Sequence, residues 1–373
     1  MELGELERLR GCRPSHFGSP LSSLRSLSSP CEGVMADLSR EDRLLLEQLQ
    51  SRFPLCARPY AELARRLGLA EGQVMERIRA LKEAGPLRQI GAIFDTRRLG
   101  YASTLVAMAV EPAQLDAVAD VVSRHPGVSH NYARAHRFNL WFTLAVPPGG
   151  DLEREVAALA GQVGVLEAFS LPTRRAFKVD VRFDLVDASE EPATPGATAE
   201  GREEGAQVAP VQGAKEALAP RDIPFVRALQ EDLPLVARPF AALGEREGVG
   251  ERALLDAAHR LLASGILRRY GATLRHREAG YRANAMAVWR VPEGRVEAAG
   301  RAAAGRREVS HCYERPAYPP AWPYQLFTMV HAHSQEELEH AVAALGELIR
   351  PLDAAVLPTV REYKKVRLRY FIE

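Results

Sequence analysis

The sequence predicts an α+β protein built as a tandem repeat. Each copy joins a winged helix-turn-helix head to a ferredoxin-like β-α-β-β-α-β domain, and the two copies form a pseudo-dimer within one chain. Three observations support this fold class. The chain has 373 residues, which is more than one ordinary core holds. Its two halves repeat each other. Within each half, helical periodicity comes first and strand-like alternation follows.

The repeat is clear in several matching segments. LQSRFPLCARPYAEL, which begins at Leu49, aligns with LQEDLPLVARPFAAL, which begins at Leu229, an offset of 229 − 49 = 180. This offset continues without a gap to the pair Pro112 and Pro292. Farther along, VSHNY matches VSHCY and LPTRRAFK matches LPTVREYK. Each half therefore has the same parts in the same order.

Composition predicts where the domains begin and end. Residues 1–34 are rich in Ser, Pro, Gly and Arg without a sustained apolar period, which is typical of a disordered leader. Residues 188–219 have the composition of a linker. The expected domains are two winged-helix heads at 35–99 and 220–279, and two ferredoxin-like domains at 100–187 and 280–373.

The first half shows the expected elements in order. Ser39 is a candidate N-cap of the first helix, with Asp42 three residues later. AELARRLGLAEGQVMERIRALKEAG predicts two helices with a turn at Gly68 and an end at Gly85. LRQIGAIFD alternates as a short strand pair or wing, and Gly100 turns the chain. The remaining elements are a strand in ASTLVAMAVE, a helix from Gln114 to His125, strands in VSHNY and NLWFTLAV, a helix from Leu152 to Val163 and a strand in AFKVDVRFDL.

Composition also excludes several classes of protein. The net charge of +1 does not indicate a nucleic-acid or membrane-surface partner. No apolar run is long enough to cross a bilayer, and we expect a cytoplasmic protein. The cysteines have no C-x-x-C spacing, which argues against a zinc site and a disulfide framework. They are Cys12, Cys31, Cys56 and Cys312.

The hairpin VSHNYARAHRFNLWFTL holds an unusual set of polar and aromatic side chains. A ferredoxin-like sheet has helices on one side, so alternate residues enter the core and the others face the open side. Alternation along the second strand predicts that Leu140, Phe142 and Leu144 enter the core. It predicts that Asn139, Trp141 and Thr143 lie on the open face.

The first strand and the turn of this hairpin add further groups. Val128, His130 and Tyr132 are predicted to point one way, and the turn brings Arg134 and His136 to the hairpin mouth. Aromatic rings offer planar area, arginine pairs with carboxylates, and histidine can ligate a metal or transfer a proton. This face suits a large, flat, anionic partner. A dimer interface stays open, because Tyr, Trp and Arg are also enriched at interfaces.

The second half repeats the hairpin with a different turn. His311, Tyr313 and Arg315 recur in VSHCYERPAYPPAWPYQLFTMVH, but the turn is longer and rich in proline. No residue there matches His136. We therefore expect two sites that are not equivalent.

The last strand of each half adds basic groups. Arg175 and Lys178 lie in LPTRRAFK, and Arg361 and Lys364 lie in LPTVREYKK. Charges on a final strand usually protect a solvated edge. The repeated aromatic-lysine pair keeps a substrate-carboxylate role open as well.

The helix-turn-helix outline raises the question of DNA binding. The second helix of the first copy presents Arg77, Arg79 and Lys82. Its counterpart has Asp256 and little base-reading chemistry, and a near-neutral chain neutralises few phosphates. We therefore expect no nucleic-acid partner.

These segments resemble two related groups of proteins. The head that ends in RRLGY, followed by the β-α-β-β-α-β unit, resembles the leucine-responsive and asparagine-type transcription regulators in each half. The two hairpins, with LPTRRAFK and LPTVREYKK, look like those of the siroheme decarboxylase family, which reuses that regulator fold. Both hairpin turns of the family's paired subunits occur here, one per half. The chain resembles a fusion of the two subunits.

The resemblance implies a carboxy-lyase. Its expected reaction converts siroheme to 12,18-didecarboxysiroheme by removing two acetate carboxylates as carbon dioxide, in heme d1 synthesis or the alternative route to heme. The implied partners are siroheme and its products, with no cofactor beyond the iron of the substrate, and further homo-oligomerisation stays open. The alternative function is a transcription regulator that binds DNA and a small-molecule effector.

The resemblance and the residue chemistry together suggest roles for individual side chains. Acids or iron contacts would be His130, His136 and His311. Carboxylate anchors and pocket walls would be Tyr132, Arg134, Asn139, Trp141, Arg175, Lys178, Tyr313, Arg315, Arg361 and Lys364.

Overall fold

The computed structural model describes residues 38–165, 167–179, 218–274 and 283–372. The predicted leader at 1–34 lies outside the described residues, and so does the predicted linker up to residue 217.

Each half begins with a helical head, as predicted. Ser39 Oγ accepts a hydrogen bond from the Asp42 N–H at 3.1 Å and so caps the first helix. Gly68 ends the second helix with φ 68°, and Gly248 has the same φ at the corresponding turn. The helices of the two heads are α1 (Arg40–Ser51), α2 (Pro59–Leu67), α3 (Glu71–Glu83), α6 (Ile223–Leu229), α7 (Pro239–Arg246) and α8 (Glu251–Ala263).

The strand predicted as a wing has its partner in the other half. Strand β1 (Leu87–Phe94) pairs antiparallel with β7 (Leu267–Leu274), and Gly91 lies opposite Gly271. The two heads thus share one two-stranded sheet. The sequence instead predicts a strand pair or wing within each head. Period-two alternation identifies the faces of a strand and does not identify its neighbour, so the sequence could not assign this pairing.

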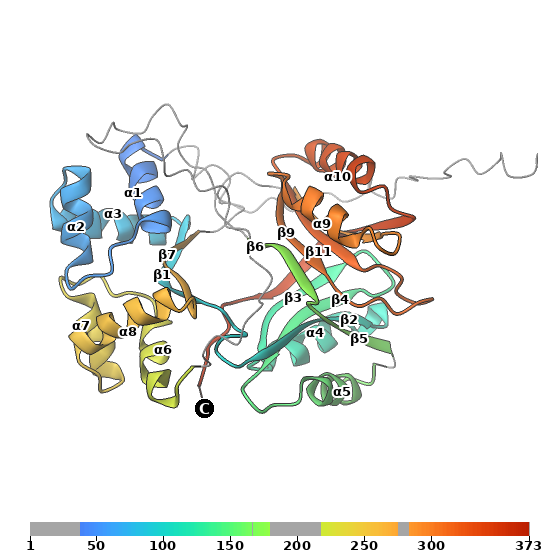
Figure 1. Ribbon diagram of the computed structural model, residues 1–373, viewed down its shortest axis with the longest axis horizontal. Coiled ribbons are helices and arrows are strands. Elements are labelled where there is room, and N and C mark those ends of the chain that lie inside the picture. The colour runs from blue at the N-terminus through green and yellow to red at the C-terminus, as the bar shows by residue number, and fades with distance from the viewer. Residues whose placement is uncertain (1–37, 166, 180–217, 275–282, 373) are drawn as a thin grey trace, which may run out of the picture. The chain divides into compact units, whose positions relative to one another are not determined.

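The second part of each half follows the predicted β-α-β-β-α-β order, except that two strands, β5 and β6, end the first half where the sequence predicted one strand in AFKVDVRFDL (Figure 1). The first set is β2 (Ala102–Ala109), α4 (Leu115–Arg124), β3 (Val128–Arg134), β4 (Leu140–Val146), α5 (Leu152–Gln162), β5 (Glu167–Pro172) and β6 (Arg175–Val179). The second set is β8 (Ala283–Arg290), α9 (Val296–Ala304), β9 (Val309–Glu314), β10 (Leu326–Ala332), α10 (Gln335–Ile349) and β11 (Asp353–Lys365). Short 3-10 turns at Pro112–Gln114 and Pro220–Asp222 precede α4 and α6.

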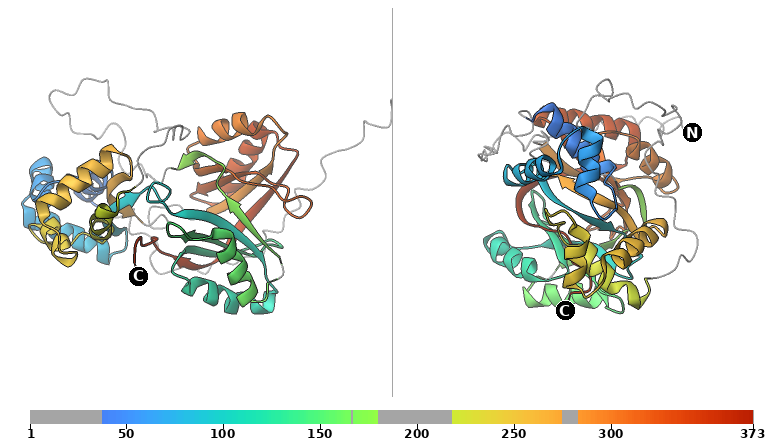
Figure 2. Two further views of the ribbon diagram at one scale, coloured as in Figure 1. Left: turned by 60° about the horizontal axis from the view of Figure 1, so that its bottom comes forward. Right: turned by 90° about the vertical axis from the view of Figure 1, so that its left-hand side faces the viewer.

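The two halves exchange their last strands. The sheet order is β5-β2-β4-β3-β11-β8-β10-β9-β6. Strand β6 of the first half pairs with β9, and the end of β11 pairs with β3. The strands at the two ends of this order, β5 and β6, are consecutive and joined only by Thr173 and Arg174, so the sheet curls back on itself (Figure 2). The predicted pseudo-dimer within one chain is confirmed, and it is held by strand exchange.

Helices cover one face of this sheet. On the other face, the two halves of the chain pack against each other. One apolar cluster joins β2, β3 and β4 to α4 and α5, and a second joins β8, β9 and β10 to α9 and α10. We call the opposite side the inner face. Its apolar cluster contains buried residues from both halves, namely Ala107, Phe138, Trp141, Leu171, Met286, Val288, Trp322, Phe327 and Leu357.

A β-bulge changes the predicted alternation on β3. The register with β4 shifts between Val128 and His130, so Ser129 is the extra residue. Val128 therefore packs with the helix-side cluster, whereas His130 lies beside Tyr132 with ring centroids 6.2 Å apart. The prediction that Val128 shares a face with His130 is wrong for this reason. The same shift on β9 separates Val309 from His311.

Candidate active site

Each half contributes the same three side chains to the inner face. The imidazole and phenol ring centroids lie 6.2 Å apart in the first triplet and 5.9 Å apart in the second. The guanidinium carbon lies 5.5 Å from the tyrosine ring centroid in the first and 4.9 Å in the second. The triplets are His130, Tyr132 and Arg134 in the first half and His311, Tyr313 and Arg315 in the second.

The two arginines are held by backbone of the opposite half. Arg134 donates to the Leu357 carbonyl at 2.9 Å and to Thr359 Oγ1 at 3.2 Å. Arg315 donates to the carbonyl of Leu171, the residue that matches Leu357 in the repeat. Arg134 thus contacts β11 and Arg315 contacts β5, so a strand of the opposite half completes each triplet.

These guanidinium groups are buried without a counter-charge. Arg134 and Arg315 are only 7% and 8% exposed, and the Nε atom of each has no hydrogen-bond partner. Among the described residues, neither guanidinium forms an ion pair with a carboxylate. Burial lowers the pKa of each to about 10. Because a buried cation is costly without an anion beside it, the pair is suited to receive anionic groups from a ligand.

The two histidines share one electrostatic environment. Burial lowers the pKa of His130 to about 4, and the charges of Lys365 and Arg88 lower it further. Burial also lowers the pKa of His311 to about 4, and His331 and His130 are among the charges that contribute. Both imidazoles are therefore neutral near neutral pH when no anion is bound. Both residues are partly buried.

The depressed histidine pKa values predict that the protein without a ligand loses stability in acid. His130, His311 and His331 have a pKa of about 4 when folded against an ordinary 6.5. As the pH falls, these histidines bind protons in the unfolded chain before they do so in the folded protein. Their contribution to the free energy of unfolding is therefore full above pH 6.5 and is lost as the pH falls towards 4. Each histidine lowers the free energy of unfolding by at most about 3 kcal/mol across this range.

Urea unfolding at several pH values across this window measures the loss. His311→Leu should flatten part of the profile, whereas His340→Ala, on the exposed side of α10, should leave it as in the wild type. A wild-type unfolding free energy that stays constant across the window would contradict the assignment.

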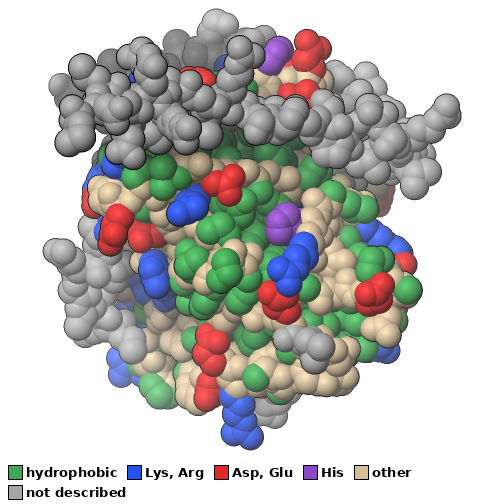
Figure 3. Space-filling view, turned by 90° about the vertical axis from the view of Figure 1, so that its right-hand side faces the viewer, with side chains coloured by type: hydrophobic (Ala, Val, Ile, Leu, Met, Phe, Trp, Pro, Cys, Tyr) green, Lys and Arg blue, Asp and Glu red, His purple; other side chains and the backbone are tan. Residues whose placement is uncertain are grey.

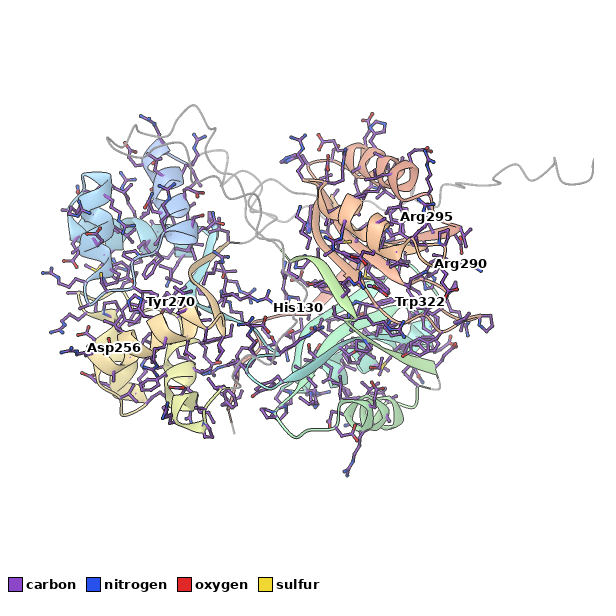
Figure 4. The ribbon with its side chains drawn as sticks, in the orientation of Figure 1. His130, Asp256, Tyr270, Arg290, Arg295 and Trp322 are labelled. Atoms are coloured by element: carbon purple, nitrogen blue, oxygen red, sulfur yellow. The ribbon has the colours of Figure 1, made fainter. Side chains whose placement is uncertain are left out.

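His136 lies apart from His130. Its ring centroid is 5.6 Å from that of Trp322 and 6.0 Å from that of Phe138, and its Nδ1 accepts from the Phe138 N–H at 3.0 Å. His130 lies at the other end of β3, and Figure 4 shows His130 and Trp322 well separated along the sheet. The structure therefore does not join His136 to the first triplet.

Trp141 and Asn139 take structural positions beside the triplets. Trp141 is 1% exposed in the inner apolar cluster, and its Nε1 donates to the Phe138 carbonyl at 2.6 Å. The Asn139 side-chain amide donates to the Val110 carbonyl at 2.8 Å and accepts from the Val110 N–H at 2.9 Å. Gln325 makes the same pair of bonds with Val291 in the second half. These amides tie the turns to the neighbouring strands.

The arginines of the exchanged strands face the outer helices. Arg175 pairs with Glu297 of α9 at 2.6 Å, and Arg361 pairs with Asp116 of α4 at 2.8 Å. Asp116 and Glu297 correspond in the repeat, because 297 − 116 = 181 matches the offset 311 − 130 = 181 of the histidines. The structure thus places both arginines away from the inner face.

The lysines of the exchanged strands bind the ends of outer helices. Lys364 Nζ donates to the Ser123 carbonyl at 2.6 Å and to the His125 carbonyl at 3.2 Å, at the C-terminus of α4. Lys178 Nζ donates to the Arg306 carbonyl at 2.9 Å, just after α9. A cation at a helix C-terminus satisfies free carbonyls and interacts favourably with the helix dipole.

Replacing Arg175 or Arg361 with Ala should therefore leave ligand binding on the inner face unchanged. Both side chains are exposed partners of outer carboxylates, and exposed ion pairs contribute little. Spectral titration of each variant with an iron tetrapyrrole, beside the wild type, measures the effect. A large loss of affinity in either variant would show that these arginines reach the ligand.

Comparison with known proteins identifies the family. A family model described as the siroheme decarboxylase NirDL-like HTH domain matches residues 42–88 and 222–268, and one described as an AsnC-like ligand binding domain matches 98–178 and 278–364. The siroheme decarboxylase of Hydrogenobacter thermophilus is 39% identical over 330 residues, which cover 88% of this chain and 94% of that protein. The chain belongs to the siroheme decarboxylase family.

Other members of the siroheme decarboxylase family support the fused arrangement. The NirDL subunit of Paracoccus denitrificans is 37% identical over 82% of this chain and 90% of its own length. The alpha subunit of the Desulfovibrio desulfuricans enzyme is 42% identical but covers 41% of this chain. A crystal structure of the siroheme decarboxylase NirDL matches with TM-score 0.68, 36% identity and coverage of 89% and 94% of the two chains. A second structure of NirDL, in complex with an iron-uroporphyrin III analogue, matches with TM-score 0.67 and 35% identity over 89% and 95%.

Sequence reasoning missed three basic groups near the histidines of this family member. Lys365 pairs in register with His130, and the charge of Arg88 also lowers the pKa of His130. A cavity of about 420 Å³ is lined by Arg88 and by residues 366–370, beyond the end of β11. His331 contacts the serine beside His311. Lys365 and His331 have no basic counterpart in the first half, so the repeat does not mark them. Arg88 matches Arg268 in the repeat, but it lies on the wing strand, far along the sequence from the hairpin.

The described part of the chain also gives two negative findings. It contains no helix long and apolar enough to span a membrane. It also contains no cluster of three or more histidine, cysteine, aspartate or glutamate side chains that could hold a metal ion.

Proposed function

We propose that this chain is a carboxy-lyase that removes two acetate carboxylates of siroheme as carbon dioxide and forms 12,18-didecarboxysiroheme. The observation that supports it most is the pair of buried, carboxylate-free arginines, Arg134 and Arg315, each beside a tyrosine ring and a neutral histidine on one shared face. Siroheme is flat, aromatic and rich in carboxylates, and such a face complements each of these properties. The iron enters with the substrate, and we propose that the protein adds no cofactor of its own.

The residues of each triplet have distinct tasks in this proposal. Arg134 and Arg315 bind rim carboxylates, and Tyr132 and Tyr313 provide planar contact area. The bond between the ring-attached carbon and the carboxylate carbon breaks, carbon dioxide leaves, and the electron pair stays on the ring-attached carbon, where the macrocycle delocalises it. A proton then forms the new C–H bond. His130 and His311 are the proton donors that we propose.

The binding of an anionic substrate would prepare these histidines to act as acids. Burial and neighbouring cations hold the pKa of His130 near 4 in the free protein. Carboxylates placed beside the ring would favour its charged form and raise that pKa. The substrate itself would therefore promote protonation of the donor.

The alternative function, a DNA-binding regulator, has weaker physical support. Two of the basic groups on α3 are already paired, Arg77 with Asp42 at 2.8 Å and Lys82 with Asp232 at 2.8 Å. Figure 3 shows the side of the chain formed by the sheet domains and not by the heads; acidic and basic side chains are interspersed around hydrophobic ones there, so this side offers no continuous basic track either. DNA binding requires phosphate neutralisation by free cations.

One anaerobic experiment separates the two functions. Siroheme is incubated with the full chain, and products are analysed by mass and absorption. Loss of two carbon dioxides supports the decarboxylase. Unchanged siroheme, together with salt-sensitive retention of duplex DNA, would support the regulator instead.

A further inference from the structure

His331 is connected to His311 through one hydroxyl group. Its Nε2 lies 2.8 Å from Ser310 Oγ, and the same oxygen lies 2.9 Å from His311 Nδ1. His331 lies on β10, adjacent to the strand that holds His311. Ser310 is the bulged residue of β9, which explains how its side chain reaches both rings. The three groups form a continuous hydrogen-bonded chain.

The first half has the same serine but a different end to the chain. Ser129 Oγ lies 3.0 Å from His130 Nδ1 and 2.7 Å from Thr143 Oγ1. A threonine hydroxyl neither gains nor loses a proton near neutral pH, whereas an imidazole does. The two triplets thus have the same histidine and the same neighbouring serine, but the serine contacts Thr143 in the first half and His331 in the second.

We propose that His331 is a positioning residue for His311: it fixes the tautomer of His311 and returns a proton to it after each reaction. This inference rests on the proposed decarboxylase function. In the resting arrangement that this proposal requires, Ser310 donates to His311 Nδ1 in preference to the more distant Met329 carbonyl at 3.4 Å, and the proton of neutral His311 is then on Nε2. A hydrogen bond to one ring nitrogen sets which nitrogen carries the proton.

The proton transfers balance along the chain. His311 Nε2 gives its proton to the carbon that has lost carbon dioxide. His311 Nδ1 then takes the hydroxyl proton of Ser310, and Ser310 takes the Nε2 proton of protonated His331. All three groups end neutral, with the proton of His311 on Nδ1. Solvent then protonates His311 Nε2, and the Nδ1 proton returns through Ser310 to His331, which restores the starting state. The first half cannot do this, because Thr143 has no titratable group to supply the proton.

The surroundings of this chain contain several other charges. Burial lowers the pKa of His331 to about 4, and the charge of Lys365 on β11 contributes. His311 faces the charges of His130 on β3, Lys178 on β6 and Arg315. An anionic substrate among these cations would raise the pKa of the linked pair, so that His311 and His331 hold one added proton between them, on His331 at the start of the relay. Proton supply by His331 therefore depends on an occupied site.

Two replacements of His331 separate the two roles. His331→Gln keeps a side-chain N–H that can donate to Ser310 but cannot supply a proton, and His331→Ala removes both. The readouts are anaerobic product masses, the rates of each carbon dioxide loss across pH, and a spectral titration with siroheme. A matched control is His340→Ala, because His340 is exposed on α10.

We expect His331→Ala to slow one carbon dioxide loss about 10- to 100-fold, with siroheme affinity retained, which is the usual effect of removing a partner behind a reacting group. The accumulating monodecarboxylated isomer should be the one that His311→Ala accumulates. His331→Gln should recover part of the rate and lose its pH dependence. Equal slowing of both losses, or unchanged kinetics in an active protein, would overturn the inference. A wild type without any carbon dioxide loss would instead reject the proposed function.

Discussion

Replacing His130 or His311 with Ala should stop the reaction after one carbon dioxide loss. Each histidine lies in its own triplet with an arginine and a tyrosine, so each is expected to protonate one ring-attached carbon. Removing a positioned acid typically costs about a hundredfold to ten-thousandfold in rate. The double replacement should leave siroheme unchanged.

Anaerobic incubation followed by mass analysis gives the result directly. Each single variant should accumulate a monodecarboxylated product, and the two variants should accumulate different isomers. The exposed His340→Ala variant is the control for a general effect of histidine replacement. If either single variant produces the doubly decarboxylated product at the wild-type rate, that histidine is not an acid in this reaction.

Replacing Arg134 or Arg315 with Met should weaken siroheme binding about 10- to 100-fold, because a hydrogen bond to a charged group contributes about 1.5 to 3 kcal/mol. Methionine keeps much of the apolar volume and removes the cation. The double variant should lose most of the increase in melting temperature that siroheme gives the wild type, since ligand stabilisation scales with affinity.

The arginines of the exchanged strands provide the matched control. Arg175→Met and Arg361→Met remove the same charge from the outer face, where each guanidinium already has a carboxylate partner. Their siroheme titrations should overlay that of the wild type. Equal weakening in the inner and outer variants would show that net charge, and not position, governs binding.

Much of the fold could be predicted from the sequence, because repetition and periodicity are local properties. The 180-residue offset, the turn at Gly68 and the order of strands and helices are all visible in the chain. Strand exchange is not a local property. The segments LPTRRAFK and LPTVREYKK alternate equally well beside either half, and only the tertiary structure shows that each crosses over.

The same limit applies to the site. Alternation placed His130 and Tyr132 on one face, and both lie there with the matching pair from the second half. It failed for Val128, because an unseen bulge shifts the register by one residue. The sequence groups Arg361 with Arg315 among the carboxylate anchors of the second half, because both are basic. The structure separates them, since one pairs with Asp116 outside and the other is buried inside.

The central claim is that the inner face, completed by strand exchange, binds the substrate. The most direct measurement is a crystal structure of this chain with siroheme bound under anaerobic conditions. The account predicts the macrocycle between β3 and β9, with rim carboxylates at Arg134 and Arg315 and reacting acetates facing His130 and His311. A macrocycle bound against the helical heads or the outer faces, with the inner triplets empty, would contradict it.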